Sequence, residues 1–304
     1  MRVFVTGASG HVGSAVIPEF IEAGHQVVGL ARSDEAAEKV AAAGAAVQRG
    51  TLTDLDVLRQ AAADADGVVH LAFMHDWMRT GDFAAAIAAD LAATQAIGET
   101  LVGSDKAFVT TSGIGMLAMS GISGRLGTEQ DVVPGGPRVD AENYAIGLSE
   151  RGVRSSVVRL PPSVHSDLDH HGFVPTLIAI ARDKGYAAYI GEGASRWSAG
   201  DTRDTAHLYR LAAESAPAGT RLHAVADEGV SFREIAETIG AMLELPVRSI
   251  GEQDAEDYYG FLARFAALDM VASSAITRAL LGWEPTRPGL IADLRLGHYF
   301  AQGA

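Results

Sequence analysis

Short apolar runs alternate with alanine-rich stretches along the first half of the chain. The apolar runs occupy positions 3–6, 27–30, 46–49, 67–72, 108–111 and 155–160. Most are almost continuously apolar rather than alternating, which is typical of strands buried on both faces by flanking helices. The stretches between them, such as 14–23 and 54–63, predict those helices. The pattern therefore predicts an α/β fold with a doubly wound parallel sheet of the Rossmann type.

The bulk properties limit the classes of partner. The 304 residues carry a formal net charge of -14 at pH 7, which disfavours binding to nucleic acid or to an anionic membrane surface. The chain contains no cysteine, so disulfides, thiolate nucleophiles and cysteine-ligated metals are excluded. We find no signal-peptide pattern and no apolar run near the ~20 residues that span a bilayer. We therefore expect a soluble, cytoplasmic protein that binds neither nucleic acid nor membrane.

The stretch VFVTGASGHVGSAV, residues 3–16, is the most informative part of the chain. A predicted strand leads into Gly7, Gly10 and Gly13, and a predicted helix follows. Glycines at such a turn let the backbone come close to a pyrophosphate, and the helix N-terminus supplies N–H donors and a positive dipole. The stretch therefore predicts a dinucleotide-binding loop.

The residues after the second predicted strand indicate which dinucleotide is bound. An acidic residue at this place binds the ribose hydroxyls of NAD, but here Arg32 and Ser33 follow the strand. A guanidinium and a hydroxyl suit a 2′-phosphate, so we expect NADP as the cofactor, with NADPH preferred over NADH. In the alternative, Arg32 is a solvated surface charge and Asp34 or Glu35 binds the ribose.

Several motifs in order resemble the short-chain dehydrogenase/reductase superfamily in its extended form, the NAD-dependent epimerase/dehydratase type. They are TGASGHVG (6–13), DGVVHLA (66–72), FVTTSG (108–113), VVRLPPSVHSD (157–167) and LLGWEP (280–285). The resemblance covers essentially the whole chain. Together with the loop, it assigns cofactor binding to Thr6, Gly7, Ser9, Gly10, His11, Val12, Gly13, Arg32, Ser33, Leu52, Leu71, Ala72, Thr111, Arg138 and Pro161.

The resemblance also implies a division of the chain. We expect an NADP-binding core over residues 1–160. Residues 161–304 are then mainly a smaller C-terminal substrate-binding region, interleaved with late Rossmann elements at about 200–226. This region should fold over the carboxyl edge of the sheet, where open α/β sheets bind ligands.

The catalytic segment departs from the family pattern. Membership implies hydride transfer at a nicotinamide, a Tyr acid/base with a Lys four residues later, and a Ser or Thr that falls on Ser112. The family also has a Glu four residues after the Lys. Counting back from Glu142 places Arg138 at the Lys position and Pro134 at the Tyr position. Proline has no side-chain proton to donate, whereas Arg138 retains a charge that suits ribose hydroxyls.

Tyr144 lies close to this segment, but its spacing is wrong for the missing acid. The fourth residue after it is Leu148 rather than Lys. Tyr144 also follows Arg138 by six residues, which places it about 120° away on a helix. We interpret it as a packing residue.

A relocated proton donor is expected just after the fourth predicted strand, beside the nicotinamide. His75 is the first candidate because imidazole is suited to proton transfer near neutral pH, and an ordered water is the alternative. The loop HSDLDHHG (165–172) is rich in His and Asp, but its spacing matches no metal site, and we expect no metal. We expect the substrate to contact Phe73, Asp76, Trp77, His165, His171 and Trp197. Met74, Phe173 and Tyr189 would add to a mostly apolar pocket.

Three functions are compatible with these features. The first is an NADPH-dependent oxidoreductase, of the carbonyl reductase or alcohol dehydrogenase type, acting on a small and fairly apolar substrate. Its catalytic residues would be Ser112, Arg138 and His75. The second is a non-catalytic NADP(H)-binding sensor or regulatory protein, which the missing Tyr favours. The third is an epimerase, dehydratase or isomerase that recycles its hydride internally. A homodimer is the expected assembly, because the family often pairs subunits.

Overall fold

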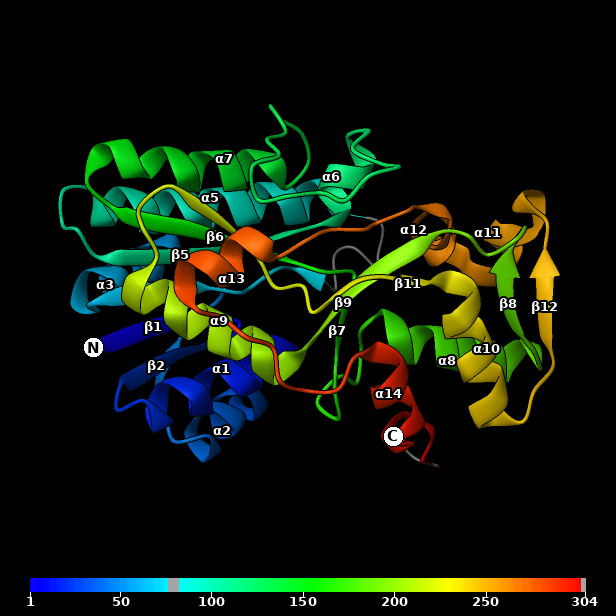
Figure 1. Cartoon of the computed structure of the whole chain (residues 1–304). Helices are drawn as coiled ribbons and strands as arrows, with labels where there is room; N and C mark the ends of the chain where they lie inside the picture. The colour runs from blue at the N-terminus through cyan, green and yellow to red at the C-terminus, as the bar shows by residue number, and fades with distance from the viewer. Residues whose placement is uncertain (76–81, 302–304) are drawn as a thin grey trace.

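A seven-stranded parallel sheet forms the centre of the molecule (Figure 1). The computed structural model describes residues 1–75 and 82–301. The strand order is β10-β6-β5-β4-β1-β2-β3, and every neighbouring pair is parallel. The strands are β1 (Arg2–Thr6), β2 (Gln26–Ala31), β3 (Ala46–Arg49), β4 (Gly67–His70), β5 (Ala107–Gly113), β6 (Arg154–Leu160) and β10 (Thr220–His223).

Helices cover both faces of this sheet. One face carries α1 (His11–Glu22), α2 (Asp34–Ala42) and α9 (Thr202–Ser215), and the other carries α3 (Leu55–Asp64), α5 (Phe83–Leu101) and α7 (Val139–Gly147) (Figure 1). The strands β1, β4 and β5 are covered by helices on both faces, so side chains on both faces are buried. Their sequences are therefore almost continuously apolar. The predicted Rossmann fold is confirmed.

The rest of the chain forms a second layer of structure beside the carboxyl ends of the strands (Figure 1). It contains a three-stranded sheet and a two-stranded sheet, in the orders β11-β9-β7 and β12-β8. The strands are β7 (Ser163–His165), β8 (Ala187–Ile190), β9 (Arg196–Asp201), β11 (Asp227–Ser231) and β12 (Val247–Ile250). The helices are α6 (Gly115–Met119), α8 (Phe173–Lys184), α10 (Phe232–Leu243), α11 (Ala255–Tyr259), α12 (Ala263–Ala267) and α14 (Leu290–Arg295), with 3-10 turns η2 (Glu252–Asp254), η3 (Gly260–Leu262) and η4 (His298–Phe300). Two further elements belong to the Rossmann core: the 3-10 turn η1 (Leu148–Arg151) follows α7, and α13 (Ala275–Leu281) packs on α9 and β10.

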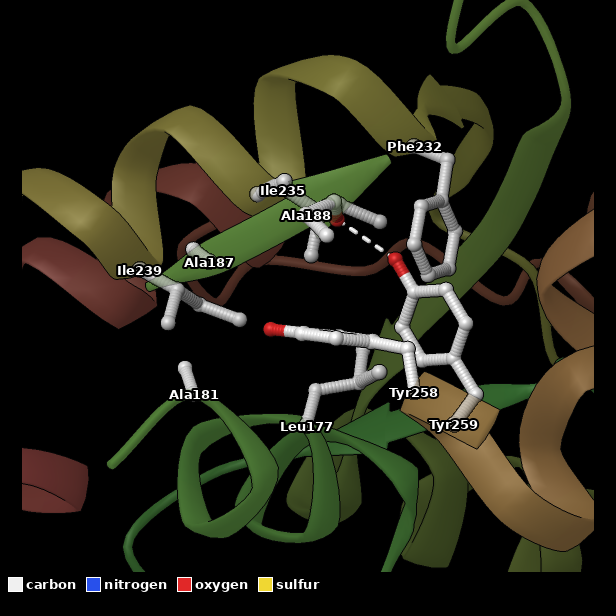
Figure 2. Close-up of a pocket in the computed structure, with 10 residues that line it drawn as sticks. Leu177, Ala181, Ala187, Ala188, Phe232, Ile235, Ile239, Tyr258 and Tyr259 are labelled. Atoms are coloured by element: carbon white, nitrogen blue, oxygen red, sulfur yellow. Dashed lines mark hydrogen bonds between the residues drawn. The ribbon is translucent and has the colours of Figure 1, made fainter. Parts of the chain in front are cut away.

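This C-terminal part has an apolar core of its own between α8, α10, α11 and β8 (Figure 2). Two tyrosines reach into it and satisfy their hydroxyls on backbone carbonyls. The hydroxyl of Tyr258 donates to the carbonyl of Tyr186, and that of Tyr259 donates to the carbonyl of Ala188. Buried tyrosines with satisfied hydroxyls indicate a packed interior rather than a ligand pocket.

Individual residues explain where some of the helices begin and end. The side chain of Ser231 accepts a hydrogen bond from the backbone N–H of Glu234 and so caps α10. Gly24 follows α1 with φ +83°, a left-handed conformation that glycine adopts without steric cost. Pro18 lies inside α1 without ending the helix. No helix within residues 1–75 and 82–301 combines the length and apolarity needed to cross a membrane.

Candidate cofactor and active site

The strand order reverses between β1 and β4, which creates a crevice at their carboxyl ends. Thr6 ends β1 and is the Cα partner of His70, which ends β4. The Thr6 hydroxyl lies 2.7 Å from Nδ1 of His70 and accepts a hydrogen bond from the backbone N–H of Ala72 at 3.2 Å. A fully buried threonine thus joins the two strands on either side of the switch point.

The glycines of the loop after β1 are required by close backbone contacts. Gly7 has φ +66°, and a Cβ there would lie 2.8 Å from the backbone nitrogen of Ala72. A Cβ on Gly13 would lie 2.2 Å from the carbonyl oxygen of Gly7. These contacts draw the first turn of α1, which begins at His11, against the loop. The result is a backbone cradle beneath a helix N-terminus, which fits the pyrophosphate of a dinucleotide.

Other residues assigned to cofactor binding surround this crevice. Ser9 and Val12 belong to the loop and the first turn of α1. Leu71 and Ala72 directly follow β4, and Pro161 directly follows β6. Thr111, on β5, donates to the carbonyl oxygen of His70 and lies 2.7 Å from the Tyr209 hydroxyl. Leu52 is buried in the core beside β2.

Arg138 projects toward this crevice from the start of α7. Its guanidinium carbon lies 3.9 Å from the ring centre of Phe73, just after β4. Its Nε lies 3.8 Å from the carboxylate of Asp90, and that carboxylate lies 3.4 Å from Nε2 of His70. A polar chain therefore runs from Thr6 through His70 and Asp90 to Arg138. Arg138 has φ +62°, a left-handed conformation rare for a side-chain-bearing residue, and such strain gathers at functional sites.

Sequence reasoning missed Asp90. Its carboxylate is almost fully buried, in the middle of the alanine-rich helix α5. A single acidic residue among apolar helix positions is a signal, because a buried carboxylate requires a partner. The partners, His70 and Arg138, come from two other segments, so the sequence did not identify them.

Ser112 lies on β5 with its hydroxyl buried and turned toward α7. The hydroxyl has no well-aligned hydrogen-bond partner among the described residues, yet it is close enough to Glu142 to lower the pKa of that carboxyl. Burial acts to raise the pKa of Glu142, but Arg159, Ser112 and Arg221 together outweigh it and the net shift is downward. Arg159 is fully buried and binds Glu142 at 2.5 Å. Ser112 thus adjoins a buried ion pair that fixes α7 on β6, and its role toward a substrate stays a prediction.

Tyr144 faces away from the crevice. Its hydroxyl donates to the carboxylate of Glu99 at 2.6 Å, and Arg151 binds the same carboxylate. Partial burial and the contact with Glu99 raise the pKa of Tyr144 to about 12. This placement agrees with a packing role.

The loop after β7 closes against the phosphate-binding turn. Nε2 of His11 lies 2.8 Å from the Thr202 hydroxyl, and its Nδ1 lies 3.7 Å from the buried carboxylate of Asp169. The Tyr299 hydroxyl donates to the other oxygen of Asp169 at 3.3 Å. Burial raises the pKa of Asp169 to about 6, and burial together with nearby histidines lowers the pKa of His11 to about 4. We call His11, Asp169, Thr202 and Tyr299 the loop latch.

The expected substrate residues divide into two groups. Phe73 lies at the crevice, and the exposed ring of His75 packs edge-on against it at a centroid distance of 5.2 Å. Met74 follows β4 beside them, and His171 is exposed in the loop over α8. Asp76 and Trp77 lie outside the described residues.

The second group is enclosed by the C-terminal part. Trp197 is fully buried, and its indole donates to the carbonyl of Phe265. Phe173 packs on Trp197, whereas Tyr189 lies on β8 beneath Arg233. His165 is fully buried, with Nδ1 2.9 Å from Asp293. Trp197 is thus enclosed in the core of the C-terminal part, with no exposed surface for the expected contact with a substrate. The predicted pocket of Phe73, Met74, Phe173 and Tyr189 is not one cluster. Met74 packs against the core of the central sheet, whereas Phe173 and Tyr189 pack against the core of the C-terminal part.

The motif LLGWEP also has a structural role. Trp283 is buried, and its indole donates to the backbone carbonyl of Asp204 in α9. The Asp204 carboxylate accepts backbone hydrogen bonds from Thr286 and Arg287. The motif therefore attaches the C-terminal segment to the Rossmann core. Within residues 1–75 and 82–301, no three His, Cys, Asp or Glu side chains are grouped so as to hold a metal ion.

The adenosine side of the crevice lies at the ends of β2 and β3. Arg32 and Ser33 directly follow β2, both are exposed, and the Ser33 side chain caps α2. Arg49 ends β3 as the Cα partner of Ala31, and it binds the carboxylate of Asp34. Sequence reasoning did not identify Arg49, because its position beside Ser33 depends on the pairing of the two strands.

A crevice with these features defines a dinucleotide-binding protein of the Rossmann class. Residues 3–123 match the model of the NAD dependent epimerase/dehydratase family. The uncharacterized protein C2A9.02 of Schizosaccharomyces pombe is 44% identical over 99% of this chain and 100% of its own. The uncharacterized protein YLL056C of Saccharomyces cerevisiae is 42% identical over 98% of this chain and 99% of its own. The chain belongs to the NAD-dependent epimerase/dehydratase family.

Solved structures share the fold at low sequence identity. The dTDP-glucose 4,6-dehydratase DesIV of Streptomyces venezuelae superposes with a TM-score of 0.77 at 18% identity, covering 100% of this chain and 98% of that one. The UDP-glucose 4-epimerase of Thermus thermophilus superposes with a TM-score of 0.72 at 19% identity, covering 99% of this chain and all of that one. Both confirm the extended short-chain dehydrogenase/reductase fold.

Proposed function

We propose that the protein is an NADPH-dependent oxidoreductase that interconverts a carbonyl group and an alcohol on a small, fairly apolar substrate. The observation that carries the proposal is the polar chain from Thr6 to Arg138. It places a charged group of the catalytic segment directly beside the crevice at the switch point.

The residues present fit a phosphorylated dinucleotide. The backbone cradle at Gly7 and Gly13 and the N-terminus of α1 would hold the pyrophosphate, and Arg32 with Ser33 would hold a 2′-phosphate. Arg138 would hold the nicotinamide ribose. When bound, the nicotinamide would supply or accept a hydride.

The chain's own residues would supply the proton and orient the substrate. Ser112 would donate a hydrogen bond to the substrate oxygen. His75, in ring contact with Phe73 on the surface of the crevice, would give or take the proton. Arg138 stays charged and is therefore a poor proton relay. Its role would be to stabilise negative charge on that oxygen and to bind the ribose.

A partial relative supports the reductive chemistry. A ketoreductase of Stigmatella aurantiaca, acting on 4-hydroxy-2-methyl-3-oxo-4-farnesyl-3,4-dihydroquinoline-1-oxide, is 42% identical over 72 residues, which cover 24% of this chain. The substrate in its name is a ketone with an apolar farnesyl tail, which agrees with the class proposed here.

The first test is turnover with a panel of aldehydes and ketones, followed by NADPH absorbance. Removing a single donor to a substrate oxyanion lowers kcat by about 10²–10³-fold. We therefore expect Ser112→Ala to lose activity on this scale while its melting temperature stays close to that of the wild type. The matched control is Ser149→Ala, because the Ser149 hydroxyl in η1 donates to the backbone carbonyl of Ile146 in α7. Unchanged turnover in Ser112→Ala would reject the role of Ser112.

The family assignment favours epimerase or dehydratase chemistry as the second candidate. Such an enzyme returns its hydride to the substrate, so it shows product formation without net oxidation of the cofactor. Binding of NADPH without any turnover would instead indicate a sensor or regulatory protein.

A further inference from the structure

Oppositely charged side chains from the ends of β2 and β3 meet on the adenosine side of the crevice. Arg49, at the end of β3, donates from one Nη to the backbone carbonyl of Ser33 at 2.5 Å. Its other Nη binds the carboxylate of Asp34. Arg32, on the same turn, precedes Ser33. This turn therefore carries two guanidinium groups and one carboxylate.

The carboxylate of Asp34 opposes the proposed cofactor preference. Asp34 is the first residue of α2, directly after the two residues that would hold a 2′-phosphate. A free carboxylate there would accept hydrogen bonds from unphosphorylated ribose hydroxyls, as acidic residues after this strand do. It would also repel a phosphate dianion. At ~6 Å in water, repulsion between a single and a double negative charge weakens binding about tenfold.

Arg49 is placed to cancel this charge rather than to bind the phosphate. One N–H of each Nη is engaged, on one side by the Ser33 carbonyl and on the other by Asp34, so the Arg49 charge is already directed at the Asp34 carboxylate. The pair is exposed, with 52% of the Arg49 side chain and 89% of the Asp34 side chain accessible. Exposed ion pairs contribute little to stability. The pair is therefore better explained by its effect on local charge than by its effect on folding.

We propose that Arg49 determines cofactor specificity by neutralising Asp34, and so preserves the affinity of the site for the 2′-phosphate of NADPH. This inference rests on the proposed use of NADPH. It assigns phosphate binding to Arg32 and Ser33, and it assigns to Arg49 the suppression of a competing NADH site.

The test is fluorescence titration of the full-length protein with NADPH and with NADH. Arg49→Gln should bind NADPH about tenfold more weakly and NADH equally well or more tightly, because Asp34 is then unpaired. Asp34→Asn should bind NADPH within about twofold of the wild type. The double variant Arg49→Gln/Asp34→Asn should return to within about threefold of the wild-type NADPH affinity, because it lacks the exposed carboxylate. The control is Arg59→Gln, since Arg59 is also an exposed arginine paired to an aspartate.

Three results would overturn the inference. A double variant that binds NADPH as weakly as Arg49→Gln would show that Arg49 acts by direct contact. Equal weakening of NADPH and NADH in Arg49→Gln would show a structural role. A wild-type protein that binds NADH at least as tightly as NADPH would overturn the cofactor preference itself. Because every measurement is of binding, a failure of the proposed reaction would leave this inference intact.

Discussion

At the scale of single residues, the site depends on how Arg138 is held. The sequence places it at the family's Lys position, and the structure adds the two groups that orient it, the Phe73 ring and the Asp90 carboxylate. Asp90 touches neither the phosphate loop nor the expected substrate position, so it is a positioning residue. Its carboxylate links Arg138 to His70 and thus to the end of β1.

We expect Asp90→Asn to weaken NADPH binding about fivefold to tenfold, because Arg138 loses the charge that directs it. The variant also removes the negative charge that Arg138 and the buried His70 face at 3.8 and 3.4 Å, which should lower the free energy of unfolding by about 1–3 kcal/mol. Titration of NADPH fluorescence and urea unfolding measure the two effects. The exposed Asp56→Asn serves as the control. Unchanged NADPH affinity in Asp90→Asn would show that Arg138 is positioned without Asp90.

At the scale of elements, the loop latch joins the phosphate-binding turn to the region that follows β7. The pKa values of two of its titratable groups, His11 and Asp169, are shifted in opposite directions. The folded pKa of His11 falls from 6.5 to about 4, so folding releases a proton between these values and stability rises with pH. The folded pKa of Asp169 rises from 3.8 to about 6, so folding takes up a proton and stability falls with pH. The two dependences nearly cancel between pH 4 and 6.

In the variant Asp169→Asn, only the pKa shift of His11 should remain, so the stability of the protein should rise with pH. We expect its free energy of unfolding to increase by about 2–3 kcal/mol from pH 4 to 6.5 relative to the wild type. Urea unfolding at half-unit pH steps measures this. The exposed variant Asp64→Asn should follow the wild-type profile. Parallel profiles for Asp169→Asn and the wild type would contradict the assigned pKa shifts.

At the scale of the whole molecule, the C-terminal part is attached to the core at several points. The Trp283 indole donates a hydrogen bond to a backbone carbonyl of α9, and β10 pairs with β6 in the central sheet. The Tyr299 hydroxyl donates a hydrogen bond to Asp169 in the loop latch. The pairing of β10 with β6 joins the predicted cofactor-binding core, residues 1–160, to the predicted substrate-binding region, residues 161–304. The Trp283 contact connects that region with a late Rossmann element, and the loop latch connects it with the phosphate-binding turn. The molecule should therefore unfold as one cooperative unit.

Differential scanning calorimetry tests this directly. NADPH at about 100 times its Kd should stabilise the protein by about 2.7 kcal/mol, which corresponds to a rise in Tm of roughly 5 °C for a chain of this size. We expect one transition that moves as a whole relative to the scan without nucleotide. Two transitions, of which NADPH moves only one, would show that the parts unfold independently.

Much of the fold follows from residues that are close in sequence. The continuous apolar runs predicted the strands, and only their ends differ, as β4 stops at His70 rather than continuing to residue 72. The loop TGASGHVG and Ser231 carry their structural information in a few adjacent positions, because a tight turn or a helix cap is a local event.

The sequence by itself determined that the protein has a Rossmann core with a dinucleotide loop, and it predicted that Pro134 and Arg138 replace the usual Tyr and Lys. Only the tertiary structure decided which distant residues complete the site. Asp90 meets Arg138, Arg49 meets Asp34, and Asp169 meets His11. The reason is physical, because each of these contacts depends on how strands are paired and helices packed, and a polar residue does not reveal its partner until the chain has folded.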